Sequence, residues 1–253
     1  MKSRFSLEIC CDSIDSALAA EQGGAQRIEL CSSLLEGGLT PSAGFIRTVR
    51  ASASIALFVM IRPRGGDFCY SECEFAAMQE DVSVVKSMGA DGVVLGLLTE
   101  EGDIDVARTA ALVELAAPLS VTFHRAFDLS ADLERSLEGV IKTGAQRILT
   151  SGGMPAAPEG AKQIRQLVEC SGDRIKIMAG SGVNSGNVAE LIAQTGVRDI
   201  HASAKAQVPS VMRFRKNVPM GSMQNDEYTR FVANEEEVRR LARALRDYEA
   251  ART

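Results

Sequence analysis

The segment GAQRIEL at residues 24–30 sets a pattern that the chain repeats three more times. The related segments read GADGVVL at 89–95, GAQRILT at 144–150 and GVRDIH at 196–201. In each, a glycine that can end a helix precedes a polar step and then a run of β-forming residues. A segment that closes a helix and opens a buried strand is typical of a βα repeat. We therefore expect strands and helices to alternate along the chain.

Short runs rich in Val, Ile, Leu and Phe predict strands of the kind that a parallel sheet buries on both faces. The eight runs are 6–11, 27–31, 56–62, 92–97, 119–125, 147–151, 176–181 and 199–203. Helical patterns follow them at 14–21, 43–51, 74–87, 106–116, 133–142, 161–169, 188–194 and 235–249. This alternation favours an α/β fold, a (β/α)8 TIM-type barrel, over an open doubly wound sheet. Such a barrel takes about 250 residues, so we expect residues 1–253 to form a single domain.

Composition argues against several classes of partner. The net charge is −5 and the pI is about 5.3, which gives no electrostatic basis for binding nucleic acid. No apolar stretch reaches the length of a membrane span, and the N-terminus has no secretory hydrophobic region. The six cysteines lack the spacing of a disulfide framework. We therefore expect a cytoplasmic protein with no nucleic-acid or membrane partner.

Residues 205–234 interrupt the alternation, because they show no clean periodicity. A loop of that length in a compact domain usually has a function or covers another part of the fold. It follows the last predicted strand, so it could fold across the mouth of the barrel or make a subunit contact. An ordered excursion over the surface is the third interpretation. We expect a long irregular loop in this region.

Strand parity predicts a polar interior. Successive strand residues point to opposite faces, and the helix-facing side of a barrel must be apolar. The residues that this rule directs inward are Glu8, Cys10, Glu29, Cys31, Arg62, His124, Thr150 and His201. Buried charges need partners, so we expect Glu8 and Glu29 to pair with Arg62 or with a protonated histidine. The cluster is either an ion-pair network that fills the barrel or a site of acid–base chemistry.

The C-terminal ends of the strands carry the candidate functional residues, as in barrel enzymes. Acid–base chemistry is assigned to Glu8, Glu29, Arg62, His124, Arg125 and Asp128. Glycines admit close backbone approach and arginines offer forked donors, so other strand ends are suited to an anionic or phosphorylated substrate. Those candidates are Arg64, Gly65, Gly66, Asp67, Gly180, Ser181, Gly182, His201 and Ser203.

Cys10 and Cys31 occupy equivalent places on consecutive predicted strands, each two residues after a glutamate. Adjacent strands lie about 4.8 Å apart, so the two sulfurs could meet. Two thiolates with a nearby methionine, such as Met60, suit a soft ion such as Cu(I). Zinc would need four ligands and would recruit His124 or His201. The alternative is structural, because free cysteine is among the residues most often buried.

Several longer motifs resemble those of one family. They read LEIC at 7–10, RIELC at 27–31, EGGLTPS at 36–42, IRPRGGDF at 61–68, VTFHRAFD at 121–128 and RILTSG at 147–152. With these motifs the chain resembles the CutC family, named for copper homeostasis, over nearly its whole length. The resemblance implies a TIM-type barrel, a cytoplasmic location and a homo-oligomer, expected to be a homodimer. It also implies that Cys10 and Cys31 are the Cu(I) ligands.

Three hypotheses for function remain open. The first is a copper-binding protein that uses Cys10 and Cys31. The second is a barrel enzyme that applies acid–base chemistry to a small anionic or phosphorylated metabolite. Schiff-base aldolase and serine hydrolase chemistry are disfavoured, because only Lys205 lies near a strand end and no Gly-x-Ser-x-Gly segment occurs. The third is a barrel that serves only as a scaffold for a partner.

Overall fold

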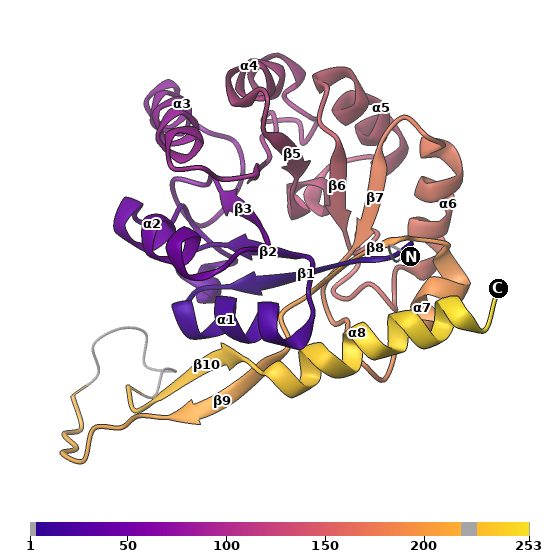
Figure 1. The fold of residues 1–253 in the computed structure, drawn as a ribbon. Helices are drawn as coiled ribbons and strands as arrows, with labels where there is room; N and C mark the ends of the chain where they lie inside the picture. The colour runs from indigo at the N-terminus through magenta and orange to yellow at the C-terminus, as the bar shows by residue number, and fades with distance from the viewer. Residues whose placement is uncertain (1–3, 219–226, 253) are drawn as a thin grey trace.

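The computed structural model describes residues 4–218 and 227–252 and contains a closed barrel of eight parallel strands in chain order (Figure 1). The strands are β1 (Ser6–Cys11), β2 (Arg27–Leu30), β3 (Ala56–Met60), β4 (Gly92–Leu95), β5 (Ser120–Phe123), β6 (Arg147–Thr150), β7 (Lys176–Ala179) and β8 (Asp199–Ala202). The pairing of β1 with β8, through Glu8 opposite His201, closes the sheet. The predicted (β/α)8 barrel is therefore confirmed, and the open sheet is excluded.

Helices surround the barrel and follow the strands in alternation. They are α1 (Ile14–Gly23), α2 (Ala43–Ser52), α3 (Glu72–Ser87), α4 (Val106–Ala116), α5 (Leu133–Thr143), α6 (Ala161–Ser171), α7 (Val188–Thr195) and α8 (Glu235–Ala250). The repeated glycine acts as the sequence predicts: Gly24, Gly144 and Gly196 follow α1, α5 and α7 with φ of 93°, 82° and 77°. This left-handed conformation favours glycine and turns the chain from a helix into the next strand.

Apolar side chains divide between two separate clusters. Leu7, Ile9 and Cys11 of β1 belong to the large cluster between the barrel and its helices. Cys10 belongs instead to a small cluster with Cys31, Phe58, Met60 and Val94. Alternating residues of one strand thus serve different clusters, as strand parity requires. The two cysteines therefore lie inside the barrel, as predicted.

Every predicted strand except 6–11 is longer than the observed one, and two of the differences affect candidate site residues. The strand expected over 56–62 ends at Met60, and the one expected over 119–125 ends at Phe123. After β5 the chain turns into the short 3-10 helix η2 (Arg125–Leu129), and His124 caps that helix by accepting a hydrogen bond from the N–H of Ala126. Arg62 and His124 therefore lie just beyond their strands, at the rim of the barrel.

The segment 205–234 is not irregular throughout. Its two ends form strands β9 (Lys205–Pro209) and β10 (Thr229–Ala233), which pair antiparallel. The pair projects past α1 and away from the barrel (Figure 1), and Val211 and Phe214 beyond β9 are exposed. The strands are half exposed and are held by backbone pairing, so no apolar periodicity marks them in the sequence. Residues 219–226 lie outside the described part.

Among residues 4–218 and 227–252, no helix combines the length and the apolar character needed to cross a lipid bilayer. The six cysteines are unpaired, in agreement with the absence of disulfide spacing in the sequence.

Candidate functional site

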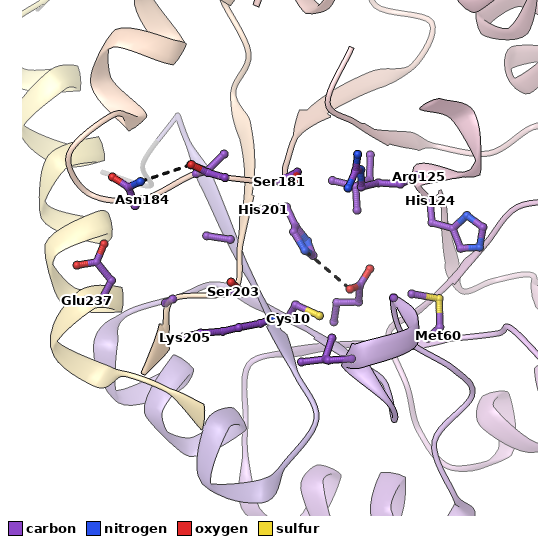
Figure 2. Close-up of a pocket in the computed structure, with 18 of the residues that line it drawn as sticks. Cys10, Met60, His124, Arg125, Ser181, Asn184, His201, Ser203, Lys205 and Glu237 are labelled. Carbon is purple, nitrogen blue, oxygen red and sulfur yellow. Dashed lines mark hydrogen bonds and ion pairs between the residues drawn. The ribbon is translucent and has the colours of Figure 1, made fainter. Parts of the chain in front are cut away.

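A cavity of about 790 Å³ opens at the C-terminal ends of the barrel strands (Figure 2). Its wall includes Cys10 of β1, Glu29 of β2, Met60 of β3 and His201 of β8. In a parallel barrel all strands end on the same side, so residues far apart in the chain converge there. The cavity lies where the sequence predicted the functional residues.

Glu8 lies at the centre of a buried ion-pair network. Its side chain is fully buried, accepts a hydrogen bond from Arg27 Nε and lies 2.8 Å from His201 Nδ1. Burial alone would raise the pKa of Glu8, but the positive charge of Arg27 and the contact with His201 lower it to about 2. Glu8 is therefore ionised and holds the ring of His201 in place.

Deeper in the barrel, Arg147 and Asp199 extend the network from Arg27. Arg147 Nε lies 3.0 Å from Asp199 Oδ1, and Arg27 Nη2 lies 3.5 Å from the same oxygen. Both guanidinium groups also stack near the ring of Phe58. Arg27 and Asp199 obey the strand parity that directs Glu29 and His201 inward, but they were not predicted as ion-pair partners, and Arg147 lies on the face of β6 that was predicted to point outward. Of the two partners expected for Glu8 and Glu29, the histidine is confirmed, because His201 lies 2.8 Å from Glu8 and 3.9 Å from Glu29. Arg62 pairs with neither glutamate, and Arg27 is the arginine that meets Glu8.

Parity on β6 was assigned to the wrong face. Arg147 reaches the interior network and Leu149 lines the cavity, so the inward positions are odd-numbered. Thr150 points away and donates a hydrogen bond to Asp128. A single apolar run such as RILT does not reveal which face is inward when both faces are buried.

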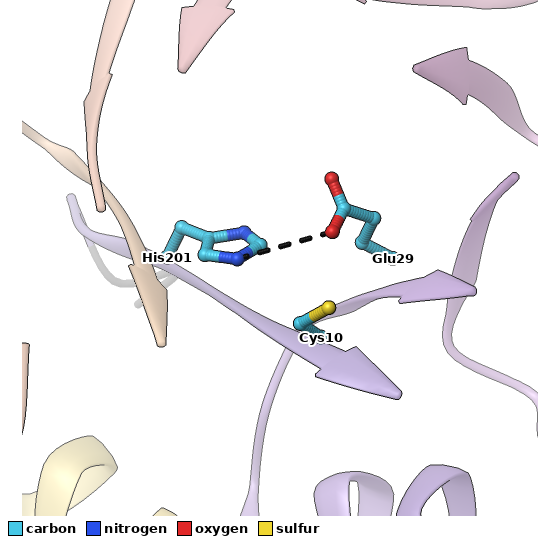
Figure 3. Close-up of side chains that lie close together, drawn as sticks. All are labelled: Cys10, Glu29 and His201. Atoms are coloured by element: carbon cyan, nitrogen blue, oxygen red, sulfur yellow. Dashed lines mark ion pairs between the residues drawn. The ribbon is translucent and has the colours of Figure 1, made fainter. Parts of the chain in front are cut away.

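Cys10, Glu29 and His201 converge on one point (Figure 3). One ligand atom from each lies within 4.8 Å of the others, and His201 Nε2 is 3.9 Å from Glu29 Oε2. Burial would lower the pKa of His201, but Glu29, Cys10 and Glu8 together raise it well above its ordinary value. Burial raises the pKa of Glu29, whose Oε1 has no hydrogen-bond partner among the described residues. The cluster therefore holds an exchangeable proton and an unused acceptor.

The two interior thiols are in contact. Cys10 Sγ lies 3.7 Å from Cys31 Sγ, with Cys31 fully buried and Cys10 8% exposed toward the cavity. The hydrogen bond with Cys31, together with burial, raises the pKa of Cys10 well above its ordinary value. Met60 adjoins the pair, because a Cβ placed on Gly38 would touch both Cys31 Sγ and Met60 Cε. The Met60 side chain thus lies beside the two thiols on the β1–β3 side of the cavity.

Arg62, Phe68 and His124 form a second group on the wall. Arg62 is only 5% exposed, and its guanidinium group stacks on the ring of Phe68. Its Nη atoms donate to the backbone carbonyls of Glu36, Gly38 and Gly66. The ring of Phe68 also packs against His124, with centroids 4.9 Å apart. Burial, together with the charge of Arg62, lowers the pKa of His124 to about 3, so His124 is neutral.

The other predicted residues divide between cavity and rim. Arg125, Ser181, Gly182 and Ser203 line the cavity. Gly180 does not line it, but a Cβ there would lie 3.1 Å from His201 Cβ, so Gly180 leaves room for that side chain.

The remaining candidates serve loop structure. Asp128 pairs with Arg125 and accepts hydrogen bonds from the N–H groups of Ser151 and Gly153, so it fixes the loop after β6. Arg64 pairs with Glu74 and Asp67. The four residues Arg64, Gly65, Gly66 and Asp67 are absent from the cavity wall.

Five further polar residues line the cavity without having been predicted as site residues: Asn184, Lys205, Asn234, Glu237 and Arg240. Asn184 follows the glycine-rich end of β7, which is a signal that sequence reasoning could have used. Glu237 and Arg240 come from α8, and the sequence shows them only as part of a charged helix face. Their place in the wall depends on how α8 packs, which no local pattern reveals.

Comparison with known proteins places the chain among its relatives. The profile of the CutC family matches residues 5–206. The chain belongs to the CutC family. It is 53% identical over 240 residues to the family protein CutC of Chromobacterium violaceum, covering 94% of this chain and 97% of that protein. The Mus musculus copper homeostasis protein cutC homolog is 46% identical over 245 residues, covering 96% and 90%.

A solved CutC structure agrees with the barrel described above. The copper homeostasis protein CutC of Streptococcus agalactiae is 33% identical, with a TM-score of 0.75 over 79% of this chain and 98% of that one. The CutC profile ends at residue 206, within β9. The rest of the β9–β10 pair and α8 lie beyond the part of the chain that the CutC profile covers.

Proposed function

We propose that this CutC family protein binds Cu(I) through Cys10 and Cys31. The observation that carries the proposal is the distance of 3.7 Å between the two sulfur atoms. Two sulfurs that each lie about 2.3 Å from one ion are about 3.8 Å apart at a tetrahedral angle and about 4.6 Å apart at a linear one. The pair therefore needs little rearrangement to hold one ion.

The donor set favours a soft metal. Thiolate and thioether sulfur select Cu(I), and Met60 adjoins the thiol pair. His201 and Glu29 offer a nitrogen and an oxygen atom that each lie within 4.8 Å of the Cys10 sulfur. The raised pKa of Cys10 means that the metal must displace a proton, so binding weakens as the pH falls. Two of the relatives are named copper homeostasis proteins, which supports the same assignment.

An anaerobic Cu(I) titration against a competing chelator tests the proposal. We expect one tightly bound ion per chain in the native protein and none in the double variant Cys10→Ser with Cys31→Ser. Cys11→Ser is the matched control, because Cys11 is equally buried but belongs to the outer cluster. Unchanged stoichiometry in the double variant, or loss of binding in the Cys11 control, would refute the proposal.

A second function is supported by the position of His201 between Glu8 and Glu29 in an open cavity. We propose, as this alternative, an enzyme that transfers protons on a small anionic metabolite. Glu29 is the carboxyl group suited to move a proton, since its pKa is raised and one of its oxygens is unpartnered. An enzyme of this kind would lose about 10²–10⁴ in rate in Glu29→Gln. Turnover that Glu29→Gln leaves intact would contradict the assignment.

We also propose that the protein acts in the cytoplasm as a homodimer. The free cysteines agree with a reducing compartment, and the family resemblance supports the oligomer. Light scattering after gel filtration tests the dimer, and a mass of one chain at micromolar concentration would contradict it.

A further inference from the structure

Arg62 is a buried cation without an acidic partner among residues 4–218 and 227–252. The two other arginines buried inside the barrel, Arg27 and Arg147, both have a carboxylate within 3.5 Å. A buried charge without an opposite charge nearby is unfavourable, because nothing offsets the free energy of removing it from water. Unlike Arg27 and Arg147, Arg62 is therefore available to pair with an anion that comes from outside the chain.

The groups around Arg62 compensate for its burial only in part. Three backbone carbonyls accept from its Nη atoms, and the Phe68 ring lies 4.8 Å from its central carbon. Its Nε is buried and makes no hydrogen bond among the described residues, and the buried hydroxyl group of Tyr70, which also makes none, faces the guanidinium group. Through these hydrogen bonds Arg62 fastens the loops near Glu36 and Gly66 to the end of β3. The carbonyl groups do not neutralise the charge of the guanidinium group, and its Nε–H group makes no hydrogen bond within the described part of the chain.

His124 supplies a second unused donor on the same wall. Its Nδ1 accepts the N–H of Ala126 at 3.2 Å, so the proton of the neutral ring is on Nε2. Nε2 is buried and has no partner among the described residues. Arg62 and His124 both line the cavity and both contact Phe68. The ring of Phe68 therefore contacts two side chains, Arg62 and His124, that each have an N–H group without a hydrogen bond among the described residues, and Arg62 also carries a positive charge without an acidic partner there.

We propose that Arg62 and His124 bind the carboxylate of a small molecule that occupies the cavity. This proposal rests on the second function above, that the cavity takes a small anionic metabolite, and it does not depend on copper. A carboxylate matches the donors in number, because it carries one negative charge and two oxygens. A phosphate dianion would leave charge and acceptor oxygens unmatched at this wall.

The ring of Phe68 covers the proposed subsite. It lies against both Arg62 and His124, and neither donor atom is accessible to water. A carboxylate reaches them when the ring moves aside, after which the ring can pack on the ligand. The remainder of the ligand then extends within the cavity toward Cys10 of β1, Glu29 of β2 and His201 of β8. The subsite would thus place the ligand beside the acid–base cluster.

Saturation-transfer NMR on the copper-free protein tests the proposal with pyruvate, lactate and benzoate. The primary amide of each acid is the neutral comparison, and inorganic phosphate is the comparison for charge. We expect at least one carboxylate to bind about tenfold or more tightly than its amide, as loss of a charge-assisted hydrogen bond predicts. Arg62→Met should weaken its binding by a similar factor. Arg64→Met should not, because Arg64 is paired outside the cavity wall.

Equal binding of acids and amides, binding of phosphate alone, or unaltered binding in Arg62→Met would overturn the proposal. If Arg62→Met does not fold, the side-chain ¹⁵N signal of His124 Nε2 in the native protein decides. It should shift with the carboxylate and remain fixed with the amide, and a fixed signal with both refutes the subsite. If a carboxylate binds but is not converted, the proposed enzyme activity is refuted and the carboxylate subsite stands. Failure of the Cu(I) titration would refute copper binding without affecting the subsite.

Discussion

Replacing Glu8 by glutamine should destabilise the barrel more than any similar surface change. The glutamine side chain would keep the shape of the glutamate but remove the charge that faces Arg27 and His201. Asp199 cannot compensate, because it lies 3.5 Å from Arg27 and is already paired with Arg147 at 3.0 Å. Breaking a buried ion pair from one side typically destabilises by about 3–5 kcal/mol. In a chain of this size that corresponds to a fall in Tm of about 6–20 °C.

Thermal and urea unfolding, followed by circular dichroism at pH 7, measure the effect of Glu8→Gln. Glu138→Gln is the matched control, because Glu138 pairs with Arg174 through two hydrogen bonds at the surface. A surface pair of this kind contributes about 0–1 kcal/mol. Equal losses in the two variants would refute the reasoning that burial gives the Glu8 network its weight.

Three other changes test particular parts of the structure. Burial lowers the pKa of His124 from its ordinary 6.5 to about 3, so on acidification the unfolded chain gains this proton before the folded chain does. Stability should therefore fall as the pH drops from about 6.5 to 3. An NMR titration in which the His124 imidazole of the folded protein titrates near pH 6.5 would contradict this. Gly160→Ala would place a Cβ in steric conflict with the carbonyl oxygen of Ser151, and we expect a loss of about 1–3 kcal/mol in urea unfolding, whereas an unchanged midpoint would show that the loop relaxes freely. Asp128→Asn breaks the pair with Arg125 and should lower stability by about 1.5–3 kcal/mol, which a Tm equal to the native value would disprove.

The fold was predictable because the signal is local and repeated. A glycine that ends a helix directly before a buried strand, as at Gly24 and Gly144, determines the alternation without any knowledge of tertiary contacts. Strand parity then placed Glu8, Cys10 and His201 inside the barrel. The β9–β10 pair was missed because its strands are half exposed and have no apolar face.

The candidate site was predictable only in part, because partner choice depends on tertiary geometry. Parity shows that a charge points inward, but not that Arg27 rather than Arg62 meets Glu8. The burial of Arg62 without an acid is likewise invisible in a sequence. Glu237 reaches the cavity from α8, which packs beside the barrel at the far end of the chain.

X-ray absorption at the copper edge of the Cu(I)-loaded protein tests the main proposal most directly. The two sulfurs 3.7 Å apart should appear as a shell of two sulfur scatterers at about 2.3 Å from the metal. That shell should disappear when Cys10 and Cys31 are both serine and persist when Cys11 is serine. A first shell of only nitrogen and oxygen, or a sulfur shell that survives the loss of both cysteines, would contradict the account.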